Sequence, residues 1–380
     1  MTRPDDSSDV IVVGAGLVGS ALAYGLARQG LRVTMLDEGD IAWRAWRANF
    51  GLVWVQGKGQ GLVDYARWSL GSARLWPKLH AMLREETGID VQLRQGGGFH
   101  LCLSEQELVE RGERLQCLQE QLGQADYPFE ILDPQSARAA LPGLGPDVPG
   151  ASFSPMDGHV NPLKLLYALR VAGQRSGVRL FAHASVQRID HTHGIYTADS
   201  GERHWQAPRI VITAGLSTQA LAGSLGLSVP VRPVKGEVLI TERVTPFLRS
   251  PTNYVRQTDE GTVQIGESRE EAGFDDRVNT AVCSRIAERA LRCFPQLRHA
   301  RLVRIWAALR IMTPDGFPIY QQSESCPGAY ALVCHSGVTL AAQHALTLAP
   351  WIAGGDEPEV IAPFSPHRFS SDILAAPHAH

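Results

Sequence analysis

The chain has 380 residues, and its 36 basic and 39 acidic side chains give a net charge of −3 without a basic block. That balance excludes the charge pattern of nucleic-acid-binding proteins, so no nucleic acid partner is expected. The first nine residues contain three aspartates and no apolar stretch, which predicts no standard secretory signal, and the length favours two interleaved domains.

The six cysteines include no Cys-x-x-Cys pair, and no histidine completes a close ligand set. We therefore expect no metal site, neither zinc nor iron–sulfur, held by this chain, and reduced thiols in a cytoplasmic protein. Residues 338–353 are apolar but are interrupted by Gln343, His344 and Pro350, which predicts a buried helix in place of a membrane span.

A strand–helix–strand unit opens the chain. Residues 10–13 are a continuous β-branched run, which predicts a strand buried on both faces of a parallel sheet. Residues 17–29 carry apolar side chains at helical spacing and end at Gly30, a natural helix stop. Residues 31–36 predict the second strand.

Gly14, Gly16 and Gly19 form the pattern G-x-G-x-x-G between the first strand and the helix. The first glycine permits a tight turn, the second lets the backbone approach a pyrophosphate, and the third lets helix and strand pack closely. Asp37 ends the second strand and can accept hydrogen bonds from an adenosine ribose, with Glu38 as the alternative. An acid here disfavours NADP, and the N-terminal, discontinuous pattern favours FAD over NAD.

The remaining elements are predicted from periodicity and turn signals. Residues 41–61 predict a long loop near the ligand. Residues 134–155 predict a Pro/Gly-rich connection. Helices are expected over 62–86, 106–122, 161–174 and 338–353, strands over 92–103, 179–190, 194–199, 209–213 and 329–334, and an antiparallel sheet from 229–241, 263–266 and 302–311.

These elements predict an α/β fold in which an FAD-binding Rossmann-like domain of the glutathione-reductase type is interleaved with an α+β substrate domain built on an antiparallel sheet. The nucleotide-binding elements open the chain and return near its middle and its end. We expect the FAD-binding domain in residues 1–85, 156–228 and 313–365, the substrate domain in 86–155 and 229–312, and a C-terminal tail in 366–380.

Four further segments carry a family resemblance: Asn-Phe-Gly-Leu-Val-Trp at 49–54, Ile-Val-Ile-Thr-Ala-Gly at 210–215, residues 308–316 around Arg-Ile-Met-Thr-Pro-Asp-Gly, and residues 335–341 around His-Ser-Gly-Val-Thr. With the N-terminal motif, they resemble the D-amino-acid oxidase superfamily of FAD-dependent oxidoreductases over about residues 9–355. Residues 49–59 are similar to a narrower set, the catalytic (beta) subunits of dye-linked dehydrogenases for D-hydroxyproline, opines, L-proline or glycine, which this motif does not separate.

The resemblance implies a set of cofactor contacts. Besides Gly14, Gly16, Gly19 and Asp37 at the ADP half of FAD, Val186 on the middle strand would meet adenine through its backbone. Ala214 and Gly215 would line the path of the nucleotide. Gly337, Val338 and Thr339, at the start of the last helix, would lie by the flavin ring, where a helix N-terminus favours negative charge. Trp46 replaces the small hydroxylated residue common near this position.

For the substrate, the resemblance implies that Arg310 holds a carboxylate through its planar guanidinium. His335 either contacts flavin or substrate or is a satisfied core residue. Tyr254 and Arg256 either line the pocket or are exposed strand residues. Lys235 and Glu237 are predicted to form cross-strand charge pairs, and Lys58 to be solvated.

The predicted function is an FAD-dependent dehydrogenase that oxidises the C–N bond of a small amino or imino acid by hydride transfer, within a multi-subunit complex. The alternatives are a free-standing oxidase of the glycine or sarcosine type and a non-catalytic flavin-binding assembly protein. Partner subunits would carry an iron–sulfur centre or a second flavin, unless a peripheral membrane acceptor collects the electrons. Trp43, Trp46 and Trp54 either form that contact or pack around the flavin.

Overall fold

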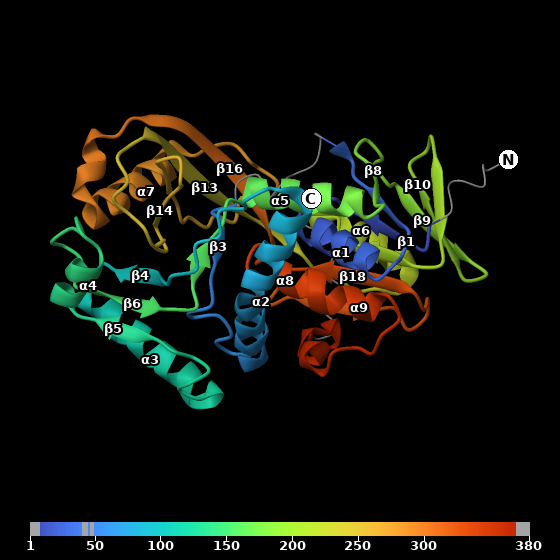
Figure 1. The fold of residues 1–380 in the computed structure, drawn as a ribbon, viewed down its shortest axis with the longest axis horizontal. Helices are drawn as coiled ribbons and strands as arrows, with labels where there is room; N and C mark the ends of the chain where they lie inside the picture. The colour runs from blue at the N-terminus through green and yellow to red at the C-terminus, as the bar shows by residue number, and fades with distance from the viewer. Residues whose placement is uncertain (1–7, 40–44, 46–48, 370–380) are drawn as a thin grey trace.

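The computed structural model describes residues 8–39, 45 and 49–369. One sheet in it contains strands from three separate parts of the chain (Figure 1). Its order is β17 (Ile319–Gln322), β18 (Ala329–Val333), β12 (Ile210–Ile212), β1 (Val10–Val13), β2 (Val33–Leu36) and β8 (Arg179–Phe181). All neighbours pair parallel except β17, which pairs antiparallel to β18. Strands β1, β2, β12 and β18 are buried along their whole length, which agrees with their largely apolar sequences and, for β1, with the β-branched run.

The two faces of this sheet are covered differently, and the alternation of side chains along β1 shows how. Val10 and Val12 pack against α1 (Leu17–Arg28) and the last helices, whereas Ile11 and Val13 pack against a small antiparallel sheet. That small sheet is formed by β9 (Arg188–Thr192), β10 (Ile195–Asp199) and β11 (His204–Ala207), with α6 (Thr218–Ala222) nearby. The helical side also holds α2 (Val63–Thr87), α5 (Pro162–Arg175), α8 (Ala341–Gln343), the π-helical turn His344–Leu348 and α9 (Ala349–Ile352).

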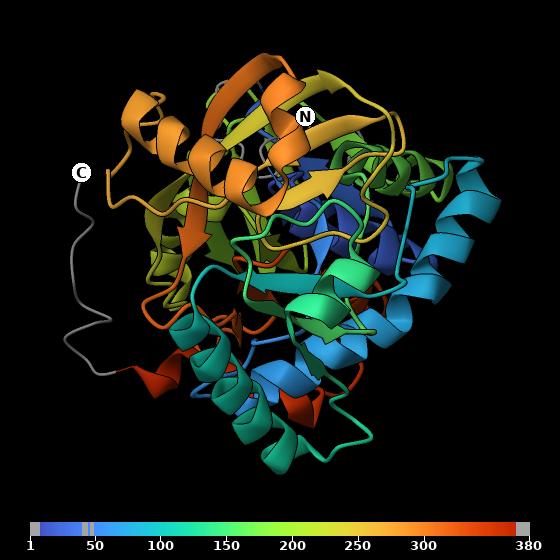
Figure 2. The same ribbon diagram turned by 90° about the vertical axis from the view of Figure 1, so that its left-hand side faces the viewer.

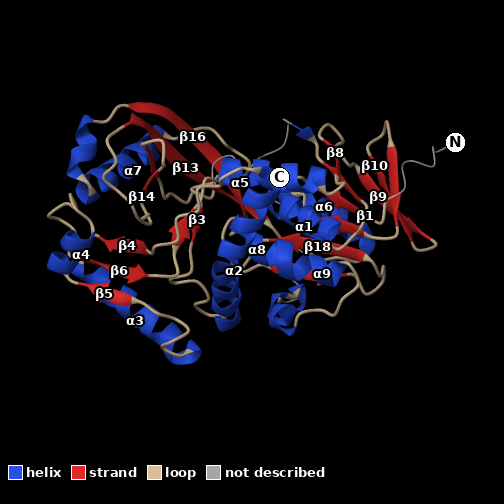
Figure 3. Cartoon of the chain, in the orientation of Figure 1, coloured by secondary structure: helices blue, strands red, loops and turns tan. Residues whose placement is uncertain are grey.

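A second region lies beside this sheet, at the left of Figure 1. Its four-stranded antiparallel sheet has the order β14 (Val255–Gln257), β15 (Thr262–Ile265), β13 (Arg232–Arg243) and β16 (Leu302–Met312), and α7 (Thr280–Cys293) covers one face of it (Figure 2). A three-stranded sheet of β4 (Gly98–Cys102), β6 (Gly150–Ser154) and β5 (Glu130–Leu132) lies with α3 (Glu105–Leu122) and α4 (Pro134–Ala140), as Figure 3 shows. The short pair β3 (Leu52–Val53) and β7 (Gly158–His159) connects the two regions.

The predicted fold class is confirmed, because a parallel nucleotide-binding sheet and an antiparallel sheet alternate along the chain. The residue boundaries of the two domains stay a prediction. Within the described ranges, no helix combines the length and the apolar composition needed to cross a membrane.

Several predicted elements differ from the structure. The strand predicted over 179–190 is split, because the chain turns after Phe181 and the Ala184 N–H donates to the Asp37 carbonyl (2.8 Å) before β9 begins. The predicted connection 134–155 contains both α4 and β6; Asp133 caps α4, accepting from the Ser136 N–H at 2.7 Å, and Pro134 occupies the first turn. The strand predicted over 92–103 begins only at Gly98, after Gly97 with its positive φ of 99°.

Candidate functional site

A cavity of about 660 Å³ lies between the carboxyl ends of the parallel strands and the antiparallel sheet, a size typical of ligand sites. At its nucleotide end it is lined by Gly14, Gly16, Asp37, Glu38 and Val186. At its substrate end it is lined by Lys58, Trp54, Arg269, Arg310 and His335. Ala214 and Gly215 lie on its wall, as do Gly337, Val338 and Thr339.

The nucleotide end depends on close approach of backbone to backbone. Gly14 follows β1 with a φ of +99°, and a Cβ there would lie 2.5 Å from the Thr213 carbonyl oxygen. A Cβ at Gly19 would lie 1.9 Å from the Gly14 carbonyl oxygen, so α1 can start this close to the turn only with glycine. Thr213 holds the turn by donating to the carbonyls of Val13 (2.9 Å) and Gly14 (3.0 Å). Gly16 is the N-cap of α1 and lines the cavity, which leaves the helix N-terminus facing it.

The acidic end of β2 lies beside this turn. Asp37 accepts hydrogen bonds from the backbone N–H groups of Ala15 (2.8 Å) and Gly39 (3.1 Å), which holds its carboxylate next to the phosphate-binding turn. Val186 lines the same end, although it lies in the extended connection between β8 and β9 and not on a strand. The glycine turn, the helix N-terminus and the acid together fit the ADP half of an FAD.

Residues 337–339 form turns ahead of the last helix, which begins at Ala341 and therefore later than predicted. Thr339 ties this segment to distant parts of the chain. Its hydroxyl accepts from the Trp54 N–H (3.1 Å) and donates to the Leu52 carbonyl (3.2 Å), and its carbonyl accepts from Ser72 (2.6 Å) and Trp76 (3.0 Å). Hydrogen bonds with Leu52 and Trp54 on one side and with α2 on the other thus fix the position of this wall.

Lys58 is not a solvated loop residue, contrary to the prediction. Its ammonium group donates to the hydroxyls of Ser336 and Tyr65 (3.2 Å to the latter), and the Tyr65 hydroxyl lies 2.8 Å from the Ser336 hydroxyl. This places a positive charge at the cavity wall next to His335. The reason is tertiary, because Ser336 is 278 residues away in sequence.

His335 has open surface toward the cavity although it lies deep in the protein. Burial, together with the positive charges of Lys58, Arg310 and Arg269, lowers the pKa of His335 well below its usual value. The imidazole is therefore neutral near pH 7 and can donate one hydrogen bond and accept another.

Arg310, on β16, lies at the substrate end as predicted, and its guanidinium passes over Gly236. A Cβ at Gly236 would lie only 2.5 Å from the Arg310 Nη2, so glycine leaves the space that the guanidinium fills. Arg310 donates to the Ser268 carbonyl, and no carboxylate of the described residues forms an ion pair with it. Burial and the neighbouring Arg269 lower the pKa of Arg310, yet a guanidinium stays protonated at neutral pH.

Tyr254 does not line the cavity. Its ring lies 4.1 Å from the Arg289 guanidinium carbon and 6.5 Å from the ring of His100, which lines the cavity in its place. The structure therefore does not bring Tyr254 together with Arg310 and His335. Arg256 is buried, not exposed, and donates to the Phe50 carbonyl (2.7 Å), which positions the segment that begins at residue 49.

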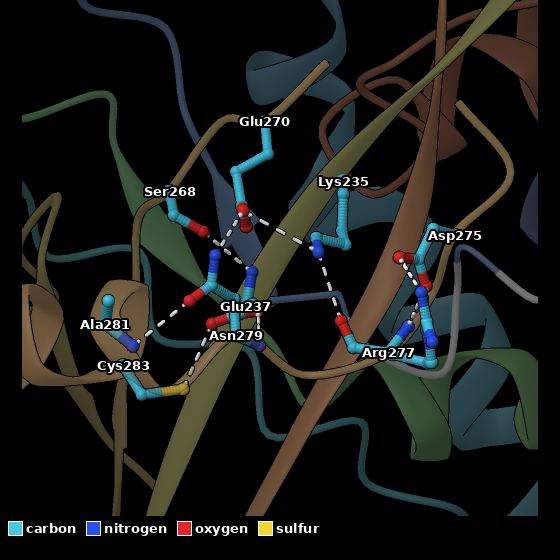
Figure 4. Close-up of polar contacts among 9 residues, drawn as sticks. All are labelled: Lys235, Glu237, Ser268, Glu270, Asp275, Arg277, Asn279, Ala281 and Cys283. Atoms are coloured by element: carbon cyan, nitrogen blue, oxygen red, sulfur yellow. Dashed lines mark hydrogen bonds and ion pairs between the residues drawn. The ribbon is translucent and has the colours of Figure 1, made fainter. Parts of the chain in front are cut away.

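Lys235 and Glu237 do not share one cross-strand pairing pattern (Figure 4). Lys235 lies 3.6 Å from the Glu270 carboxylate, whereas Glu237 accepts from the Asn279 N–H (2.6 Å) and the Cys283 thiol (3.0 Å). The predicted charge pair is therefore correct for Lys235 and wrong for Glu237. Both side chains point toward the start of α7. Glu237 accepts from Asn279, the N-cap of that helix, and Lys235 donates to the carbonyl of Arg277, two residues earlier.

Trp54 lines the cavity and lies over Gly98, where a Cβ would be 2.6 Å from the indole. That position agrees with packing around the cavity and not with an outer contact surface. Trp43 and Trp46 lie outside the described residues.

Sequence reasoning overlooked two kinds of site residue. Arg269 lies outside any predicted element, so no periodicity marked it. Asp157 is fully buried and its Oδ1 accepts from the N–H groups of Val55 and Gln56 (3.3 Å to Gln56), while its Oδ2 has no hydrogen-bond donor among the described residues. Burial raises the pKa of Asp157 to about 7. The signal that was available is a lone acid in an otherwise apolar strand–turn segment.

Comparison with known proteins agrees with this geometry. A sequence model of the DAO family, described as FAD dependent oxidoreductase, matches residues 9–353. The B subunit of opine oxidase from Rhizobium meliloti is 42% identical over 364 residues, which cover 96% of this chain and 98% of that protein. The corresponding protein of Agrobacterium tumefaciens (strain Ach5) is 41% identical, with 95% and 97% covered. The crystal structure of glycine oxidase from Geobacillus kaustophilus is similar with a TM-score of 0.88 at 27% identity, covering 95% of this chain and 98% of that one.

These similarities extend over nearly the whole chain, and the predicted resemblance is confirmed. FAD is the cofactor that the family uses, and the nucleotide end of the cavity has the turn, helix and acid that FAD needs. The chain is an enzyme and belongs to the D-amino-acid oxidase family of FAD-dependent oxidoreductases.

Proposed function

We propose that the chain is the catalytic subunit of a multi-subunit dehydrogenase that oxidises the C–N bond of a small amino or imino acid of the opine, D-hydroxyproline or proline type. One observation carries this proposal: the Arg310 guanidinium lies over Gly236 at the cavity, without an ion pair to any described carboxylate. Such a group binds a carboxylate through two parallel hydrogen bonds. The names of the two opine oxidase relatives support the substrate type and the multi-subunit assembly.

FAD, when bound, accepts the hydride that leaves the carbon next to the amine nitrogen. The nitrogen lone pair forms the C=N bond, and water then hydrolyses the imine to a carbonyl compound and an amine. The protein binds the carboxylate through Arg310 and orients the reacting carbon. Burial and the charges of Lys58, Arg310 and Arg269 lower the pKa of His335, and the same charges disfavour a proton on the substrate amine. The amine is thus held in its reactive neutral form without a strong base.

The substrate type is tested by anaerobic bleaching of the bound flavin with a panel of opines, D- and L-proline, hydroxyproline and glycine. We expect the opines or the cyclic imino acids to reduce the flavin at a rate at least equal to the steady-state turnover rate. Arg310→Ala in the same assay should retain flavin but bleach slowly. A wild-type flavin that no amine or imino acid reduces would contradict the proposal and favour the non-catalytic alternative.

The electrons must leave the reduced flavin, and we propose a partner subunit with an iron–sulfur centre or second flavin as the acceptor, in the cytoplasm. A peripheral membrane acceptor is the alternative. The chain should be expressed alone and together with the products of its neighbouring genes, and turnover should be compared with an artificial dye and with oxygen. We expect dye reduction to exceed peroxide formation. Peroxide formation by the isolated chain at the dye-linked rate would make it a free-standing oxidase.

A further inference from the structure

The backbone of residues 268–270 runs beside β13 in a register that fixes which side chains face the cavity. Lys235 and Glu270 form an antiparallel bridge, with the Lys235 N–H donating to the Glu270 carbonyl (2.9 Å) and the Glu270 N–H to the Lys235 carbonyl (3.0 Å). The Glu237 N–H donates to the Ser268 hydroxyl at 2.9 Å. Arg269 therefore lies opposite Gly236.

Alternation then separates two sets of side chains. Lys235, Glu237 and Glu270 point toward the start of α7 (Figure 4). There Lys235 forms an ion pair with Glu270, and Asn279 donates hydrogen bonds to both Glu237 and Glu270. Successive side chains of extended backbone point to opposite faces, so Gly236 and Arg269 face the cavity. The cavity lining includes Glu267 and Arg269 but neither Ser268 nor Glu270; Glu237 also borders the cavity, although its carboxylate is bound by the Asn279 N–H and the Cys283 thiol. Ser268 and Glu270 border a second cavity of about 460 Å³ beneath α7, which Glu267 and Arg269 also reach.

Arg310 reaches the same place from the other side of β13. It pairs with Val234 in the β13–β16 ladder, and its guanidinium crosses Gly236 to the Ser268 carbonyl. Arg269, opposite Gly236, and Arg310, whose guanidinium crosses Gly236, therefore both line this part of the cavity, and burial together with the charge of Arg269 lowers the pKa of Arg310. No ion pair between Arg269 and a described carboxylate relieves this repulsion, and Glu267, which also lines the cavity, leaves the three side chains with a net charge of +1.

We propose that Arg269 binds a second carboxylate of the substrate, so that the substrate class is a secondary amine with a carboxylate on each side of the nitrogen. Arg310 holds the carboxylate on the carbon that is oxidised, and Arg269 holds the other. With its amine neutral, such a substrate carries a net charge of −2, which is opposite in sign to the charge of this part of the cavity. The inference rests on the proposed function and selects the opine type over proline and hydroxyproline, which have one carboxylate.

Binding without turnover tests this role. The flavin-loaded chain, co-purified with any partner subunits, is titrated calorimetrically with two ethers that this C–N oxidation cannot consume. These are 2,2′-oxydipropionate and 2-ethoxypropionate (oxydipropionate and ethoxypropionate below), which differ by one carboxylate. Arg269→Gln should weaken oxydipropionate binding by about tenfold to a hundredfold, the usual range for a lost charged hydrogen bond. Ethoxypropionate binding should change by less than about twofold. Arg304→Gln, an exposed arginine on β16 outside the cavity lining, serves as the matched control and should change neither.

Turnover gives the second readout. Wild-type kcat/KM should favour N-(carboxyethyl)alanine over N-ethylalanine, and Arg269→Gln should remove that preference mainly through KM. Unchanged oxydipropionate binding in Arg269→Gln, or an equal loss for both ethers, would overturn the inference. If no amine reduces the wild-type flavin while the binding difference between the ethers persists, the proposed function fails and the second carboxylate site stands.

Discussion

The two ends of the cavity are built in opposite ways. The nucleotide end uses residues that are close in sequence, and its geometry depends on backbone: Gly14 and Gly16 lie in the turn before α1, Gly19 lies in the first turn of α1, and Asp37 directly follows β2. The substrate end uses side chains from segments that are far apart, since Lys58, Arg269 and Arg310 come from a loop, an edge segment and β16. The nucleotide end is thus formed by local backbone geometry, whereas the side chains at the other end are brought together by tertiary packing.

If the two ends are independent, removing the Arg310 guanidinium should weaken substrate binding and spare the cofactor. Arg310→Ala should lower kcat/KM by roughly 30-fold to 1,000-fold, from about 2–4 kcal/mol of lost carboxylate binding in the transition state. The FAD-to-protein ratio, measured by absorbance after acid release, should stay at the wild-type value. Normal kinetics, or a parallel loss of FAD, would show that the two ends are not separable in this way.

The converse change acts on the nucleotide end. Gly14→Ala combines a positive φ with a Cβ 2.5 Å from the Thr213 carbonyl, and should cost about 2–4 kcal/mol of folded-state stability together with most of the FAD. Gly30→Ala is the matched control, because its φ is +82° but nothing lies within 4 Å of the added Cβ. Thermal unfolding and flavin content should separate the two variants. Equal effects in both would mean that the close approach at Gly14 is unimportant.

A smaller change sharpens the substrate end. Gly236→Ala puts a methyl group 2.5 Å from the Arg310 Nη2, which a flexible arginine can avoid by moving. We expect kcat/KM to fall about tenfold, equivalent to about 1.4 kcal/mol, with Tm and FAD content unchanged. Gly223→Ala, where the added Cβ meets nothing within 4 Å, should leave all three unchanged. A fully active Gly236→Ala would place the carboxylate site elsewhere.

A pH-dependent effect on stability concerns Asp157, which holds the backbone of Val55 and Gln56 beneath the substrate end. Burial raises its pKa to about 7, above the value of 3.8 expected when unfolded. Between those values the folded protein binds the extra proton, so Asp157 destabilises the fold increasingly as pH rises from about 4 to 7, by at most about 1.4 kcal/mol per pH unit.

Asp157→Asn keeps an acceptor for the two N–H groups but removes the titration. Urea unfolding at pH 5, 6, 7 and 8 should therefore show that the variant gains stability relative to wild type as pH rises. A stability difference that does not vary over this pH range would contradict a raised pKa for Asp157.

The parts of the site that could be predicted are those that short-range pattern determines. The G-x-G-x-x-G turn, its helix and the acid of β2 are all where the motif puts them, because each depends on neighbours within one strand–helix–strand unit. Family resemblance, and not periodicity, predicts Arg310 as the carboxylate-binding residue; its place on the cavity wall agrees with that prediction. The parallel and antiparallel sheets followed from continuous apolar runs and from their order along the chain.

The remainder depends on contacts that no local pattern encodes. The sequence around Lys58 predicts a solvated side chain, because its hydrogen-bond partner Ser336 is far away along the chain. Arg269 faces the cavity because Glu270 forms a β-bridge with Lys235, which sets the register of this segment. Tyr254 lies on a substrate-domain segment, but the register of its turn directs Asn253 to the cavity and the tyrosine ring under Arg289. The last helix begins three residues later than expected because residues 337–339 are held in turns by bonds to Leu52 and Trp54.

The central claim is that Arg310 and Arg269 bind the substrate's carboxylates above Gly236, next to the wall formed by residues 337–339. The most direct test is a crystal structure of the FAD-loaded chain with oxydipropionate bound. We predict one carboxylate within hydrogen-bond distance of the Arg310 guanidinium, the other within reach of Arg269, and the ether oxygen facing the flavin ring beside Gly337 and Val338. A ligand bound away from Arg310, or a flavin ring on another wall of the cavity, would contradict the account.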